Sequence, residues 1–90
     1  MKLGKNRSRQ LKKFKPSNYL KRIRLGEGLT LTGLARLADL SDRTIREIEG
    51  GQRPGREVTL HQIVNALNGN PKRIRKHEYA FEEAFPSNQS

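Results

Sequence analysis

The sequence predicts an all-α fold of five short helices in one small domain. Apolar residues recur at helical spacing in successive segments, and each segment is bounded by a capping residue, a glycine or a proline. No stretch alternates apolar and polar residues as a half-buried strand would. A chain of 90 residues suits one domain with a thin core.

Three helices are expected in the first half of the domain, over residues 18–27, 31–38 and 42–50. Each follows a residue whose side chain can accept a hydrogen bond from the first turn: Ser17 or Asn18, then Thr30, then Ser41. The middle helix carries a wide apolar stripe formed by Leu31, Leu34, Ala35, Leu37 and Ala38. In the third helix, Ile45 and Ile48 are expected to face the core.

Two further helices are expected in the second half. Thr59 and Gln62 have the spacing of a capping box, which predicts a helix from there to about residue 68. This helix would bury Leu60, Ile63, Val64 and Leu67. Asn70 and Pro71 then predict a fifth helix, with Asn70 as its cap, that continues to about residue 85. In it Ile74, Phe81 and Phe85 share one side and Tyr79 points elsewhere, so Phe81 and Phe85 are candidates for core packing or for a dimer contact.

The net charge of +10 favours polyanionic partners, nucleic acid first and anionic membrane second. Residues 1–16 contain no acidic residue and too few apolar ones to bury, which predicts a flexible basic arm. Its cations are Lys2, Lys5, Arg7, Arg9, Lys12, Lys13 and Lys15. A contact with DNA phosphates and a tail that only adds solubility are the alternatives for this arm. Either way, it is too poor in large apolar residues for a membrane-surface helix.

Several classes of function find no support in the sequence. The absence of cysteine excludes disulfides and thiolate metal sites. His61 and His77 lack a neighbouring carboxylate cluster, and no nucleophile and base are suitably spaced, so we expect no enzyme, metal, cofactor or small-molecule substrate. No apolar run approaches membrane-spanning length and no secretory signal is evident, so we expect a soluble, cytoplasmic protein associated with the nucleoid.

Residues 30–50 contain the pattern that indicates function. Two short helices joined by a tight turn fit a helix-turn-helix. The second helix of this motif must expose one polar face to enter the major groove of DNA. Opposite Ile45 and Ile48, the expected helix presents Asp42, Arg43, Arg46 and Glu47.

The run from Tyr19 to Leu67 resembles the Cro and lambda-repressor-like (XRE) DNA-binding family. The matching residues are Leu29, Thr30, Leu34, Ala35, Ser41, Thr44, Ile45, Ile48, Glu49, Gly51, Pro54, Ala66 and Leu67. The sequence departs from the family in the turn, where Asp39 replaces glycine, in helix two, where Gly33 replaces a polar residue, and in a longer loop after Pro54. The resemblance implies a five-helix DNA-binding domain and a partly buried ion pair between Arg24 and Glu49, against the alternative of two solvated charges.

The resemblance places Arg43 at a base-reading position, where arginine can bind guanine with two hydrogen bonds; a phosphate contact is the alternative. Arg46 suits either a base or a phosphate. Asp42 and Glu47 can accept from a cytosine amino group or hold an arginine in position, and Asp42 can also stabilise the helix dipole. Expected phosphate contacts are the helix starts and the loop after helix three, which comprise Thr30, Leu31, Ser41, Thr44, Arg53 and Arg56. Simple capping by Thr30 and Ser41 and solvated loop arginines are the alternatives.

Together these patterns predict a transcriptional regulator, a repressor, that binds specific double-stranded DNA as a homodimer. The expected organisation is an arm over 1–16, the helix-turn-helix domain over 17–69, a C-terminal helix over 70–86 and a tail over 87–90. The alternatives are a protein-interaction module on the same fold, such as an antitoxin or coactivator-like domain, and a non-specific nucleic-acid binder driven by the arm.

Deletion of residues 1–16 separates these possibilities. We expect the shortened chain to bind DNA more weakly and with a shallower salt dependence, because seven cations are lost. Its sequence preference should be unchanged when measured by site selection beside the full chain. Complete loss of binding would instead identify the arm as the main nucleic-acid contact.

Overall fold

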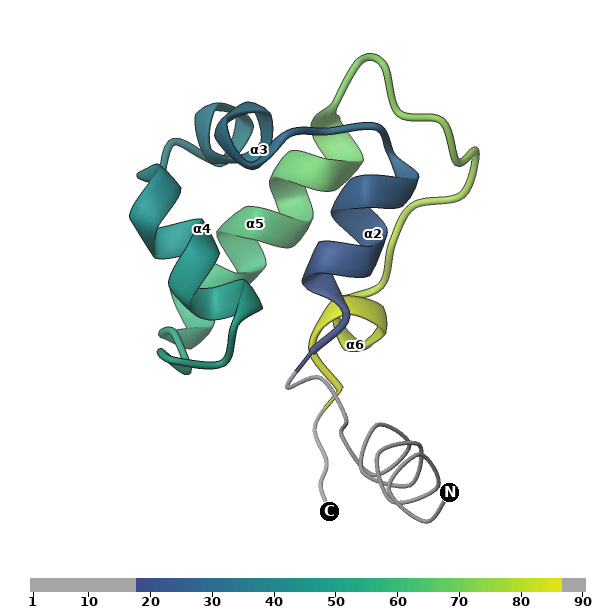
Figure 1. Cartoon of the computed structure of the whole chain (residues 1–90). Coiled ribbons are helices and arrows are strands. Elements are labelled where there is room, and N and C mark those ends of the chain that lie inside the picture. Colours follow the sequence, from purple (N-terminus) through teal and green to yellow (C-terminus); the bar gives the residue numbers. More distant parts are fainter. Residues whose placement is uncertain (1–17, 87–90) are drawn as a thin grey trace, which may run out of the picture.

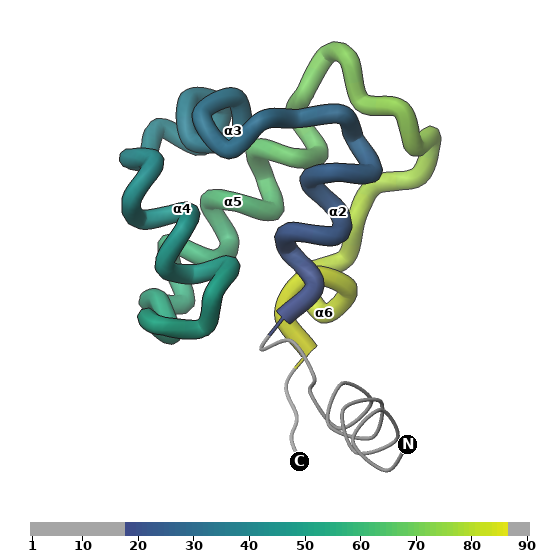
Figure 2. The backbone as a smooth tube through the Cα atoms, in the orientation of Figure 1, coloured from purple at the N-terminus to yellow at the C-terminus, as the bar shows by residue number. Residues whose placement is uncertain are grey.

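The computed structural model describes residues 18–86, which form five helices and no strand. The helices are α2 (Leu20–Gly26), α3 (Leu31–Ala38), α4 (Asp42–Glu49), α5 (Glu57–Gly69) and α6 (Phe81–Ala84). In Figures 1 and 2, α3 and α4 lie on one side of α5, and α2 and α6 lie on the other. The all-α prediction is confirmed for this part of the chain, while the arm over 1–16 and the tail over 87–90 lie outside the described residues.

The core draws its largest buried side chains from α2, α3, α4 and α5. Those that are almost fully buried are Leu20, Leu34, Ile45, Ile48, Ile63 and Leu67. The apolar stripe of α3 is narrower than expected, because Leu37 is 39% exposed. This helix packs on α4 and α5, and Leu34, Ala35 and Ala38 already fill the buried face. Burial of each large aliphatic side chain contributes about 1.5–3 kcal/mol to the free energy of folding. These few side chains therefore hold the four helices together.

The predicted caps of α3 and α4 are present. Thr30 Oγ1 accepts from the Gly33 amide at 2.9 Å, and Ser41 Oγ accepts from the Thr44 amide at 3.0 Å. Between the two helices Asp39 adopts the left-handed conformation, with φ 59° and ψ 45°. Aspartate tolerates this region better than most residues other than glycine. Asp39 therefore makes the turn that sets the direction of α4 relative to α3.

The predicted capping box at the start of α5 is wrong. The helix begins at Glu57, so Thr59 lies inside its first turn, and Arg56 precedes the helix without a side-chain cap. Gln62 instead donates its amide to the carbonyl of Ala38 at 2.5 Å. The last carbonyls of a helix have no partner within the helix, and Gln62 supplies one to α3. Gln62 therefore makes a tertiary contact with α3 and does not serve in the capping box that the local pattern predicted.

The predicted helix from Asn70 to about residue 85 is also wrong, because only Phe81–Ala84 is helical within it. The backbone over 71–80 is held by side chains from elsewhere. Glu27 Oε1 accepts from the amide of Ile74 at 2.6 Å, and its Oε2 accepts from the amide of Arg75 at 3.2 Å and from the Tyr79 hydroxyl at 2.6 Å. These backbone donors find a buried carboxylate, so they need no helix to satisfy them.

The loop places the C-terminal aromatic residues differently from the expectation. Tyr79 is buried and Ile74 is 67% exposed, the reverse of their predicted positions. Phe85 is buried in the core, and Phe81 is half-buried with its ring stacked on His61 at 4.1 Å between centroids. Core packing describes these positions, and a dimer contact through Phe81 and Phe85 stays a prediction.

The environment of Glu27 changes its titration. Burial by itself would raise the pKa of this carboxyl, but the hydrogen bonds from Tyr79 and from the amides of Ile74 and Arg75 outweigh burial. They hold the pKa below its ordinary value of 4.5. Burial and the hydrogen bond to Glu27 raise the pKa of the Tyr79 hydroxyl in turn. Glu27 is therefore a carboxylate in the folded chain.

Replacing Glu27 with alanine should lower the free energy of unfolding by about 3 kcal/mol at pH 7, because one buried and two part-buried donors lose their acceptor. Since folding lowers the pKa of Glu27, its contribution is present above about pH 4.5 and is lost as the pH falls through the folded pKa. Urea unfolding at pH 7 and pH 3 should therefore show a larger loss of stability on acidification in the wild type than in Glu27→Ala. Equal losses would contradict this role of Glu27.

Candidate nucleic-acid interface

The outward face of α4 carries the polar stripe that the sequence predicts. Ile45 and Ile48 are buried, so the opposite side of this eight-residue helix faces solvent. Arg43 and Arg46 are exposed there, and Asp42 and Glu47 are half-buried. The helix therefore presents two arginines on a surface that the fold leaves open.

An ion pair between Arg24 of α2 and Glu49 of α4 holds α4 in this orientation. Arg24 Nε donates to Glu49 Oε2 at 2.5 Å, and Nη2 donates to Oε1 at 3.2 Å. The Nη1 of Arg24 donates to the carbonyl of Leu29 at 2.9 Å. The two charged side chains are only 8% and 6% exposed. The pair thus joins α2, the link to α3, and the end of α4 through one guanidinium group.

Asn18 makes a second link between the same two helices, which the sequence did not indicate. Its Nδ2 donates to the carbonyl of Ile48 at 2.8 Å, while its Oδ1 accepts from the Leu20 amide at 3.0 Å. The second bond is a local turn before α2 and not a cap, because Tyr19 holds the cap position without a side-chain cap bond, so the predicted cap at Ser17 or Asn18 is wrong. The first joins residues 30 positions apart, and no local pattern signals such a contact.

Glu47 lies between two arginines on the exposed side of α4. Its Oε2 accepts from Arg43 Nε at 2.9 Å, and its Oε1 accepts from Arg53 Nε at 3.0 Å. The hydrogen bond from Arg43, followed by that from Arg53, holds the pKa of the Glu47 carboxyl below its ordinary value. Glu47 stays ionised and ties the helix to the loop that follows it.

Asp42 contacts neither Arg43 nor Arg46. Its Oδ2 accepts from the hydroxyl of Thr32 at 2.6 Å, a contact that crosses the turn between α3 and α4. The sequence did not single out Thr32, because its partner is ten residues away and meets it only when the turn is formed. Among residues 18–86, Arg46 has no carboxylate within ion-pair distance. Arg46 is therefore the less constrained arginine of the two on α4.

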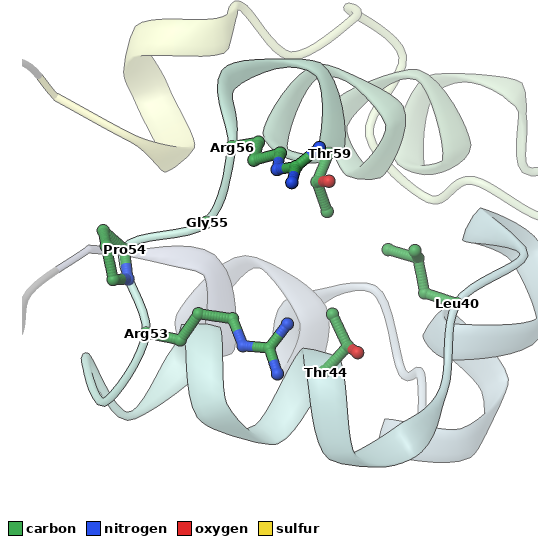
Figure 3. Close-up of a pocket in the computed structure, with 7 residues that line it drawn as sticks. All are labelled: Leu40, Thr44, Arg53, Pro54, Gly55, Arg56 and Thr59. Carbon is green, nitrogen blue, oxygen red and sulfur yellow. The ribbon is translucent and has the colours of Figure 1, made fainter.

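A hollow beside α4 gathers several of the predicted phosphate contacts (Figure 3). Its lining residues come from α4, the start of α5 and the loop between them, with one from the preceding turn: Leu40, Thr44, Arg53, Pro54, Gly55, Arg56 and Thr59. Figure 3 places Arg53 and Thr44 on the α4 side and Arg56 and Thr59 on the α5 side. The two loop arginines thus flank a hollow next to the exposed face of α4.

Gly55 allows the loop to lie close to the core. Its φ is +80°, and a Cβ built there would lie 2.9 Å from Leu60 Cδ2 and 3.4 Å from Ile48 Cδ1. A side chain would therefore strain the backbone and displace the end of the Leu60 side chain. This glycine brings Arg53 and Arg56 near α4.

The starts of α3 and α4 expose backbone amides near the same surface. Thr30 and Ser41 both act as caps, which was the alternative weighed for them, and each leaves the first amides of its helix without a partner within the helix. Leu31 and Thr44 are half-buried, and the Thr44 hydroxyl lies 2.9 Å from Ser41 Oγ. Capping leaves the other first-turn amides able to donate to a phosphate.

The described residues provide no other evident chemistry. Within residues 18–86, no three histidine, acidic or cysteine residues gather closely enough to hold a metal ion. No helix in the same range is long and apolar enough to span a membrane. The exposed polar surface around α4 is the feature of this part of the chain that most resembles a binding site.

This arrangement defines a small helical domain with a helix-turn-helix over α3 and α4. A family model described as a helix-turn-helix domain matches residues 17–75, which is more than half of the chain. The chain therefore belongs to the helix-turn-helix domain family. No curated protein and no solved structure matches it significantly. Domains of this kind are typically non-enzymatic and serve regulators that bind DNA.

Replacing Arg24 with methionine should lower the free energy of unfolding by about 3–5 kcal/mol, because Glu49 would be left as a buried charge without a partner. Replacing both residues with methionine should cost less than the sum of the two single changes, as a double-mutant cycle in urea can measure. Arg43→Met is the control, since Arg43 is 78% exposed in its ion pair, and it should leave the midpoint nearly unchanged. Additive single changes would show that the pair makes no joint contribution.

Proposed function

We propose that this protein is a sequence-specific regulator of transcription that reads the major groove of double-stranded DNA with α4. The observation that carries the proposal is the exposed face of α4, where Arg43 is braced by Glu47 and Arg46 is unpaired among the described residues. A helix fits the major groove, and arginine is the most frequent reader of guanine there.

The bond between Arg43 and Glu47 leaves a defined part of the guanidinium for DNA. The Nε of Arg43 donates to Glu47, so its two terminal nitrogens are the groups that point away from the carboxylate. These two donors can bind N7 and O6 of one guanine together. The brace also limits the rotamers of Arg43 before binding, which lowers the entropy cost of ordering this long side chain. Glu47 therefore acts as a positioning residue, while Arg43 makes the base contact.

The surrounding cations supply contacts that do not depend on sequence. Arg53 and Arg56 flank the hollow beside α4, and the first amides of α3 and α4 lie near the same surface. Phosphates of the strands on either side of the groove are the matching ligands. Affinity should then fall steeply with salt, and the order of preference among sites should not.

The finer assignments follow the resemblance to the Cro and lambda-repressor-like family. On that basis we propose a repressor that binds as a homodimer to a two-fold symmetric site. The residues that carry the resemblance include the caps Thr30 and Ser41 and the buried Ile45 and Ile48. The ion pair that the resemblance implies, between Arg24 and Glu49, is also present. Repression follows when such a dimer occupies a promoter and blocks access to it.

Selection of bound sites from a random duplex library tests this function, with wild type, Arg43→Ala and Glu47→Gln side by side. The wild type should enrich a two-fold symmetric site that contains guanine in each half. Arg43→Ala should lose preference at that guanine alone, at a cost of about 1–3 kcal/mol. Glu47→Gln should relax the same position without weakening total binding, because it frees Arg43 and also removes a negative charge near DNA.

Each result that departs from these expectations has a clear meaning. A library that yields no enriched site, with binding that depends only on salt, would overturn sequence-specific regulation and favour the arm-driven alternative. No DNA binding at all would favour a protein-interaction module. An enriched site that is not symmetric would remove the homodimer and keep the role of α4.

A further inference from the structure

A second group of cations lies on the loop between α5 and α6. Four of the five residues from 72 to 76 are lysine or arginine, and residues 70–77 include no acidic residue. Lys72 and Lys76 are exposed, and neither has an ion pair among residues 18–86. Arg75 is engaged instead, since it pairs with Glu83 at 2.9 Å and stacks on Tyr79. The charge that is available to a partner therefore comes from Lys72, Arg73 and Lys76.

The loop backbone is anchored at several points. Asn70 Oδ1 accepts from the Lys72 amide at 3.0 Å, Glu27 accepts from the next amides along the loop, and Arg73 Nη1 donates to the carbonyl of Lys76 at 3.1 Å. The Glu27 carboxylate, which binds the loop amides, is shielded from solvent, since this residue is only 6% exposed. The cations therefore lie on a loop whose backbone is held by hydrogen bonds, and the Glu27 carboxylate that makes two of these bonds is buried.

Helix α2 extends this positive surface. Lys21 and Arg22 are exposed on α2, and Arg22 lines the same small hollow as Arg75 and Tyr19. Figure 1 shows the loop after α5 on the far side of α2 from α4. We name the group formed by Lys21, Arg22, Lys72, Arg73 and Lys76 the loop–α2 surface. It lies apart from the face of α4 that we assign to the major groove.

We propose that the loop–α2 surface binds the phosphate backbone of a second DNA duplex, so that one chain can join two DNA segments. Cations outnumber acidic residues at this surface, because Glu83 is paired with Arg75 and Glu78 is the exposed acidic residue that follows Lys76. Such an excess of positive charge matches a polyanion with regularly spaced charges. A protein partner would more typically require an apolar centre within a polar rim. Here the exposed apolar side chains are Ile74, with an arginine on each side in the sequence, and Tyr19 and Leu25 at opposite ends of α2. This goes beyond the proposed function and uses it only to assign the first duplex to α4.

A two-duplex capture experiment on the full chain tests the proposal. An immobilised duplex that carries the selected site is saturated with protein, and binding of a labelled random-sequence duplex is then measured at several salt concentrations. The double variant Lys72→Gln/Lys76→Gln should bind the second duplex at least about tenfold more weakly, with a salt slope smaller by about two. Its affinity for the first duplex should change less than about twofold. Lys72→Arg/Lys76→Arg keeps both charges and should capture the second duplex as the wild type does.

Different failures point to different errors. Unchanged capture by the glutamine variant would overturn the proposal and assign any second duplex to the arm or to a second copy of α4. Polyglutamate serves as a probe for an acidic protein partner. If the glutamine variant binds polyglutamate more weakly than the wild type but captures the second duplex equally well, the surface binds an acidic protein and the proposal is wrong. An equal loss of affinity for both duplexes would show that the two surfaces are not separate. Arg43→Ala tests the first site independently, since it should change only the first duplex.

Discussion

The buried ion pair of Arg24 and Glu49 is the interaction on which the rest of the domain depends. The three helices α2, α3 and α4 are seven or eight residues long and too short to be stable in isolation. Leu20, Ile45 and the few other core residues hold them together, but apolar contacts alone do not select one orientation. A guanidinium that binds the end of α4 and the Leu29 carbonyl at once has few alternative geometries, so it fixes the orientation of α4.

Two acidic residues of α4 are already engaged by other side chains, which makes them compatible with the DNA contact that we propose for this helix. Glu47 accepts from arginines on both sides, and Asp42 accepts from Thr32. A free carboxylate would repel phosphate, whereas a carboxylate that orders an arginine makes the positive surface more specific. The same logic applies to Glu27, whose buried charge organises the loop after α5 while the loop cations face outward. At these two places, negative charge positions positive charge.

Local signals predicted most of the helix-turn-helix because they act within one turn. The caps Thr30 and Ser41 and the left-handed turn at Asp39 depend on neighbouring residues only, and they lie where expected. The ion pair of Arg24 with Glu49 came from the family resemblance, since no spacing rule joins residues 25 apart. The predictions failed where a distant side chain competed for local groups: Gln62 binds the end of α3 instead of completing a capping box.

The sequence by itself determined the all-α class, the positions of α3 and α4, and the polar stripe on α4, because helical periodicity and capping are properties of neighbouring residues. It also determined that positive charge dominates the surface. Only the tertiary structure decided that residues 71–80 form a loop, since the buried carboxylate of Glu27 lies 47 residues before the amide of Ile74. It likewise decided that Glu47 braces Arg43 and that Thr32 holds Asp42. Those pairings depend on which rotamers meet, and that becomes definite only when the helices are packed.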